Sequence, residues 1–95
     1  MGRPEDGLVI VGSKPTMNYV LACLTLFHQG SSRVRVRARG KAISKAVDVV
    51  LLVLNRFAVD AELEKVELER ERLMSKSGRP VEKSAIVITL AKRAR

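Results

Sequence analysis

The sequence predicts an α/β protein of the α+β two-layer sandwich type, with its elements in the order β-α-β-α-β-β. Two segments of the 95-residue chain carry apolar residues at helical spacing, and each follows a short run typical of a strand. The last third holds two more strand-like segments joined by a turn of serine and glycine. Two parallel crossovers and a terminal hairpin give a mixed four-stranded sheet, with both helices on one face and a protruding C-terminal β-hairpin.

The first strand is expected at Leu8–Val11, a short apolar run closed by a glycine. The helix after it is expected to run from Pro15, which suits the first helical position, to about Gln29. Gly30 can then adopt the left-handed conformation that ends many helices. The predicted apolar stripe of this helix consists of Met17, Val20, Leu21, Leu24 and Phe27.

The second strand, Arg33–Arg39, alternates without interruption between arginine and a small apolar residue. One face of this strand is therefore expected to carry Val34, Val36 and Ala38, and the other face four arginines. A second helix is expected from about Lys41 to Phe57. Its predicted apolar stripe consists of Ile43, Val47, Val50, Leu54 and Phe57.

The last two strands are expected at residues 61–74 and 84–92, on either side of a turn or loop at residues 75–80. The apolar phase shifts after Leu63, which predicts a β-bulge near Glu64–Lys65. At ~3.3 Å per residue, a long hairpin strand spans roughly 30 Å. Such a hairpin is long enough to project beyond a body of this size.

The charge of the chain is strongly basic and unevenly distributed. Lys and Arg number 18 against 10 Asp and Glu, which gives a net charge of +8. The bases are concentrated in residues 31–45, which contain no acid, and in residues 75–95, which contain one. These blocks favour a polyanion as partner. The longest nearly apolar stretch, residues 19–27, is far shorter than the ~20 residues of a membrane span, so no membrane partner is expected.

Residues 1–7 are expected to form a loose tail and residues 8–95 a single domain. The chain has one cysteine and one histidine, Cys23 and His28, which lie about 140° apart around the predicted helix and cannot form a catalytic pair. Cys23 is expected in the core. No acidic cluster has the spacing of metal ligands. We therefore expect no enzyme activity, no metal and no cofactor.

Two glycine-containing corners before the predicted helices are the best candidates for binding phosphate. At Arg39–Gly40–Lys41 the backbone can approach a ligand closely, and the helix N-terminus offers free N–H groups. Ser13 and Lys14 occupy the corresponding place before the first helix. In a right-handed β-α-β-α layout both corners lie at the same end of the sheet, so their bases would share one surface. For the corner before the first helix, the alternative is an ordinary helix start.

The arginine face and the hairpin supply the other candidates. Arg37 and Arg39 are expected to contact phosphate. The alternative for all four arginines of the face is a solvated surface, or pairing with the glutamates of the third strand at positions 62, 64, 67, 69 and 71. Lys76, Arg79 and Lys83 are expected at the hairpin tip, where they form either a basic arm or a merely solubilising loop.

Four segments carry a resemblance to a known family: residues 12–22 (GSKPTMNYVLA), residues 37–48 (RARGKAISKAVD), Asn55–Arg56–Phe57 and Gly78–Arg79. In these the sequence resembles the Alba family, the small basic chromatin proteins of archaea. The resemblance implies a homodimer, cytoplasmic and associated with the chromosome. It implies a protein that coats and compacts double-stranded DNA with little sequence preference, its hairpin arms in the minor groove. Many members also bind RNA.

The resemblance assigns nucleic-acid contacts to a central basic surface and to the arms. By motif match, Lys14, Arg39 and Lys41 take the central phosphate contacts, and residues 76–83 form the arms. With the candidates from the corners and the arginine face, the expected nucleic-acid-binding residues are Ser13, Lys14, Arg37, Arg39, Gly40, Lys41, Lys45, Lys76, Arg79 and Lys83. Ser13 replaces the first of two lysines common in the family, a reported acetylation site, so Lys14 is the candidate for modification. Glu82 stands where an arm base is often found, which weakens the arm.

The resemblance also places Phe57 where neighbouring dimers meet on DNA, and we expect the dimer–dimer contact to include Leu51, Leu54, Arg56 and Phe57. Leu51 and Leu54 replace residues that are commonly charged in relatives, and we expect an enlarged apolar dimer–dimer patch. The alternative is that both leucines enlarge the core or the dimer seam. Two other functions stay open: a protein acting mainly on cellular RNA, and a scaffold whose arginines bind an acidic protein.

Overall fold

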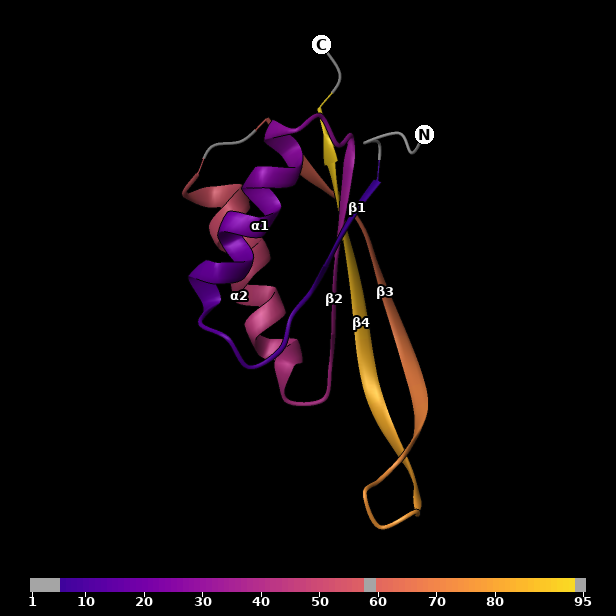
Figure 1. Ribbon diagram of the computed structural model, residues 1–95. Coiled ribbons are helices and arrows are strands. Elements are labelled where there is room, and N and C mark those ends of the chain that lie inside the picture. Colours follow the sequence, from indigo (N-terminus) through magenta and orange to yellow (C-terminus); the bar gives the residue numbers. More distant parts are fainter. Residues whose placement is uncertain (1–5, 58–59, 94–95) are drawn as a thin grey trace.

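The computed structural model describes residues 6–57 and 60–93, so the first five residues of the predicted tail lie outside the described part. Two helices cover one face of a four-stranded mixed sheet, and a long hairpin projects from one end (Figure 1). The elements are β1 (Asp6–Ile10), α1 (Thr16–His28), β2 (Arg33–Arg39), α2 (Ala42–Asn55), β3 (Ala61–Met74) and β4 (Pro80–Lys92). This confirms the predicted α+β two-layer sandwich and the order of its elements.

The strands lie in the order β1-β2-β4-β3. β1 is parallel to β2, and β4 is antiparallel to both β2 and β3. β4 therefore lies between the two strands that the α2 crossover connects. The molecule measures 49 × 31 × 20 Å, and its long dimension reflects the projecting hairpin.

The core lies between the sheet and the helices. Val34, Val36 and Ala38 of β2 are at most 2% exposed and face the helices, as the alternation predicts. Leu90 of β4 is fully buried beside them. Gly7 permits close packing of β1 against α1, because a Cβ there would lie 2.7 Å from Leu26 Cδ1. No helix in the described part of the chain is long and apolar enough to cross a membrane.

The predicted helical stripes are partly wrong. Met17, Leu21 and Val47 are 43, 56 and 38% exposed. The helices contact each other as well as the sheet, so the buried arc of each includes small residues that allow close approach. The residues that are buried are Tyr19, Val20, Cys23 and Phe27 of α1, and Ala46, Val49, Val50 and Val53 of α2.

The strand ends also differ from the prediction. β1 begins at Asp6, so two residues assigned to the tail belong to the sheet. β4 begins at Pro80 instead of Ser84, because pairing with β3 continues to the turn even where the sequence is polar. The predicted bulge is confirmed, since the register between β3 and β4 shifts between Leu63 and Lys65.

Candidate nucleic-acid interface

The corner between β2 and α2 is built around Gly40, which has a positive φ of 56°. Its N–H donates to the carbonyl of Ser84 (2.8 Å), which fastens the corner to β4. A Cβ at Gly40 would lie 3.5 Å from Lys83 Cδ, so the Lys83 side chain passes over the glycine. The prediction that placed Lys83 at the hairpin tip is therefore wrong: β4 starts earlier and carries this lysine to the corner.

A cavity of about 770 Å³ opens at this corner. Four cationic side chains, one acidic side chain and several apolar residues line it. The cations are Arg37, Arg39, Lys41 and Lys83, and the acid is Glu71. Gly12 also lines the cavity, so the loop before α1 reaches the same site. Predicted binding residues from two separate segments, residues 37–41 and the start of β4, thus line one cavity.

The loop before α1 is held from two sides. The Tyr19 hydroxyl accepts hydrogen bonds from the N–H groups of Gly12 (2.9 Å) and Lys14 (3.0 Å). The Lys45 ammonium donates to the carbonyls of the same two residues, at 3.2 and 2.7 Å. Lys45 therefore positions the loop, and its predicted contact with phosphate stays a prediction. Sequence reasoning missed Tyr19, because an aromatic residue on a helix gives no sign that its hydroxyl holds a loop.

Both corners lie at the end of the sheet from which the β3–β4 hairpin projects (Figure 1). The side chain of Lys14 does not line the cavity described above. It lines an adjacent groove of about 550 Å³ between β1 and α1, and Ile10 borders both hollows. Ser13 and Lys14 are exposed. The structure thus brings the bases of both corners to one end of the sheet. Lys14 lines one hollow, Arg39 and Lys41 line the other, and Ile10 lies between the two.

On the face away from the helices, the arginines of β2 reach across β4 to glutamates of β3. Arg33 pairs with Glu64 (2.8 Å), and Arg39 pairs with Glu71 (3.1 Å). Arg37 also pairs with Glu71. The intervening residues of β4 have short side chains that let the long ones meet above them: Ala85, Val87, Thr89 and Ala91. The alternative of glutamate pairing is therefore present for three of the four arginines.

Hydrogen bonds from the arginines lower the pKa of two of these glutamates. Hydrogen bonds from Arg39 and then Arg37 hold the pKa of Glu71 below the usual glutamate range. A hydrogen bond from Arg33 lowers the pKa of Glu64 in the same way. Both glutamates are therefore ionised at neutral pH and partly neutralise the arginine face.

The hairpin tip is a tight turn at residues 75–79. The Ser75 N–H donates to the Arg79 carbonyl (2.8 Å), and the Gly78 N–H donates to the Ser75 carbonyl (2.9 Å). Lys76 and Arg79 are exposed there, as predicted. Glu82 pairs with Arg70 (2.8 Å) and lies 3.8 Å from Arg72, so it neutralises two arm bases that the sequence prediction did not select.

Known proteins share this arrangement. The model of the Alba family matches residues 8–70. The chain belongs to the Alba family. The protein named "DNA/RNA-binding protein Alba" of Methanocella arvoryzae is 46% identical over 87 residues, 92% of this chain and 91% of that protein. The protein of the same name from Thermoplasma acidophilum is 43% identical over 88 residues, 93% of this chain and 98% of that protein.

Solved structures of Alba proteins agree. Alba from Thermoplasma volcanium superposes with a TM-score of 0.85 at 43% identity, covering 90% of this chain and 100% of that one. ALBA1 from Trypanosoma brucei superposes with a TM-score of 0.74 at 28% identity, covering 96% of this chain and 72% of that one. Membership of the Alba family places the chain among binding proteins and not among enzymes, as predicted.

Cys23 and His28 lie in different environments in this Alba-family chain. Cys23 is fully buried, and burial raises the pKa of its thiol to about 11, whereas His28 is exposed. Within residues 6–57 and 60–93, no group of three or more His, Cys, Asp or Glu side chains is placed to hold a metal ion.

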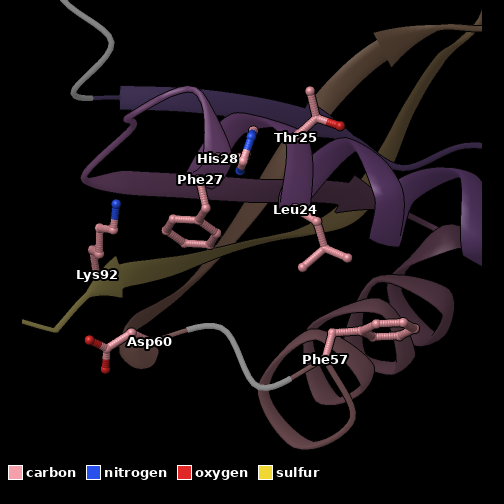
Figure 2. Close-up of a pocket in the computed structure, with 7 residues that line it drawn as sticks. All are labelled: Leu24, Thr25, Phe27, His28, Phe57, Asp60 and Lys92. Atoms are coloured by element: carbon pink, nitrogen blue, oxygen red, sulfur yellow. The ribbon is translucent and has the colours of Figure 1, made fainter.

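The residues expected to form dimer–dimer contacts differ in exposure. Leu51 and Phe57 are 49 and 39% exposed, and Arg56 is exposed, whereas Leu54 is partly buried against the core. The alternative that Leu54 enlarges the core is therefore correct in part. Phe57 follows α2 and lines a pocket of about 520 Å³, opposite the residues of α1 (Figure 2).

Proposed function

We propose that this protein coats and compacts double-stranded DNA as a dimer with little sequence preference. The observation that carries the proposal is the corner cavity, where Arg37, Arg39, Lys41 and Lys83 converge. Cations and backbone N–H groups recognise phosphates, which every sequence shares, so such contacts position the protein without reading bases. The hairpin, with Lys76 and Arg79 at its tip, would extend the contact into the minor groove.

An exposed apolar strip supports the dimer. Leu63, Val66 and Leu68 lie on the helix side of the edge strand β3 and are 51, 49 and 79% exposed. At ~25 cal/mol per Å², covering each with a second copy contributes on the order of 1.5–3 kcal/mol. Leu68→Glu should therefore dissociate the dimer in sedimentation analysis, whereas Leu21→Glu, on an exposed site of α1, should not. A dimeric Leu68→Glu protein would contradict this part of the proposal.

Contacts between dimers are proposed at Leu51 and Phe57, with Arg56 and Leu54 at their side. Leu51→Glu should reduce the cooperativity of binding to long DNA, and Leu21→Glu is again the matched control. Unchanged cooperativity in Leu51→Glu would remove this proposal.

RNA is the second candidate ligand, because the relatives are named for binding both DNA and RNA. Competition between duplex DNA and duplex RNA at equal salt separates the two, since A-form grooves differ in shape and carry 2′-hydroxyl groups.

We also propose that Lys14 is a modification site and that the protein is cytoplasmic and bound to the chromosome. Lys14→Gln, which mimics acetylation, should weaken binding to every duplex.

A salt titration tests the main proposal. If a dimer neutralises roughly 6–10 phosphates, its affinity should fall about 10³–10⁵-fold between 50 and 200 mM salt. Arg39→Ala should weaken all duplexes alike, whereas Lys92→Ala removes the same charge at the opposite end of the sheet and should change affinity little. Equal losses in both variants would overturn the role of the corner. Tight binding of an acidic protein with negligible affinity for nucleic acid would overturn the function itself.

A further inference from the structure

A carboxylate occupies the centre of the proposed phosphate site. Glu71 lies on β3, opposite Lys83 in the register, and its side chain is only 17% exposed. Its Oε1 accepts a hydrogen bond from Arg39 Nη1 (3.1 Å), and its Oε2 accepts one from Arg37 Nη2. Both arginines that were expected to contact phosphate are therefore already bound to an anion.

The same guanidinium groups cannot serve Glu71 and a phosphate equally well at one time. The guanidinium group of arginine carries parallel N–H donors that can bind either a carboxylate or a phosphate. The two anions therefore compete for the same donors. The arginines also keep the pKa of Glu71 below its usual range, so the carboxylate is charged at neutral pH. A nucleic-acid phosphate can accept hydrogen bonds from both Arg37 and Arg39 only after their ion pairs with Glu71 have broken.

We propose that Glu71 is a specificity-determining residue of this interface: it keeps small phosphates from binding to Arg37 and Arg39, and only a polyanion displaces it. The proposal rests on the proposed binding of nucleic acid. An anion held within the same chain has an effective concentration on the order of millimolar or above. A small phosphate makes a single contact and must compete against that concentration with no compensating interaction.

A duplex makes several contacts at once. Lys41 and Lys83 line the same cavity, and neither forms an ion pair within the described part of the chain. They are therefore available for the first contact with a phosphate backbone, which carries one charge per ~1.7 Å of duplex. These contacts, together with those of the hairpin, offset the displacement of Glu71. Once released, Glu71 no longer neutralises the arginines that face the backbone.

Glu64 provides a matched control. It is held by Arg33 as Glu71 is held by Arg37 and Arg39, with an N–O distance of 2.8 Å, and its pKa is lowered for the same reason. Neither Glu64 nor Arg33 lines the cavity. Glu64→Gln and Glu71→Gln thus remove the same charge and the same kind of ion pair, but only the second change opens the proposed phosphate site.

The experiment measures binding of the full-length protein to duplex DNA, alone and with inorganic phosphate as competitor at constant ionic strength. Glu71→Gln should bind duplex about tenfold more tightly than Glu64→Gln, equivalent to about 1.4 kcal/mol. Added phosphate should weaken binding by Glu71→Gln and leave wild type unchanged. In an Arg37→Gln/Arg39→Gln background, Glu71→Gln should give no greater gain than Glu64→Gln. Thermal unfolding confirms that each variant is folded.

Two results would overturn the inference: equal affinities of Glu71→Gln and Glu64→Gln for duplex, or equal competition by phosphate against wild type and Glu71→Gln. If no variant binds nucleic acid at all, the proposed function fails. The role of Glu71 is then decided by NMR of the arginine Nε–H groups. Phosphate binding to Arg37 and Arg39 in Glu71→Gln but not in wild type supports it, and any other pattern refutes it.

Discussion

Replacing Tyr19 with phenylalanine should loosen the loop before α1 while leaving the core packed. The hydroxyl accepts two hydrogen bonds, from the N–H groups of Gly12 and Lys14, and the ring is only 9% exposed. Each such bond contributes about 0.5–1.5 kcal/mol net. Water can solvate the freed N–H groups of this exposed loop, so the combined loss should be about 1–2 kcal/mol. At about 4–8 °C per kcal/mol for a domain of this size, the midpoint of thermal unfolding should fall by roughly 4–16 °C.

Amide hydrogen exchange tests the local part of this prediction. In Tyr19→Phe, the amides of Gly12 and Lys14 should exchange faster than in wild type. The amide of Val11, which donates to the Arg37 carbonyl (2.8 Å), is the internal control and should keep its protection. Urea unfolding at fixed protein concentration gives the free energy. An unchanged urea midpoint with unchanged exchange at Gly12 and Lys14 would refute the hydroxyl's role.

Three further predictions concern the core and the ion pairs. Leu90→Ala removes a fully buried side chain and should lower the free energy of unfolding by about 2–5 kcal/mol in urea; a loss below that range would mean that the site collapses. A thiol reagent should modify Cys23 only as fast as the protein unfolds, because its thiol is buried and has a pKa of about 11; rapid labelling of native protein would disprove this. Folding lowers the pKa of Glu64 and Glu71, so their contribution is present at neutral pH and lost as pH falls through the folded pKa. Thermal midpoints of a Glu64→Gln/Glu71→Gln protein should therefore fall less on acidification than those of wild type, and parallel curves would contradict it.

The sequence predicted the element order well because each signal was local. The alternation in β2 assigns Val34, Val36 and Ala38 to the core, and the phase shift after Leu63 marks the bulge. The helical stripes were predicted less well, because the helices bury small residues such as Ala46 while larger ones such as Leu21 stay exposed.

The site was predicted only in part. The glycine corners could be recognised from the sequence, since a positive φ and a helix start both have local signatures. The position of Lys83 beside Gly40 could not, because it depends on how far β4 pairs with β3. The ion pairs of Glu71 with Arg37 and Arg39 depend on a strand order that places β4 between β2 and β3. Such contacts follow from tertiary structure and leave no spacing pattern in the sequence.

The most direct test of the phosphate-binding surface is the salt dependence of duplex binding in Lys83→Ala. The sequence predicts this lysine at the hairpin tip, whereas the structure places it beside Gly40 at the corner. The surface predicts a uniform loss of affinity for unrelated duplexes and a slope of log affinity against log salt that is shallower by about 0.9 for each lost contact. An unchanged affinity and slope, or a loss confined to one DNA sequence, would contradict it.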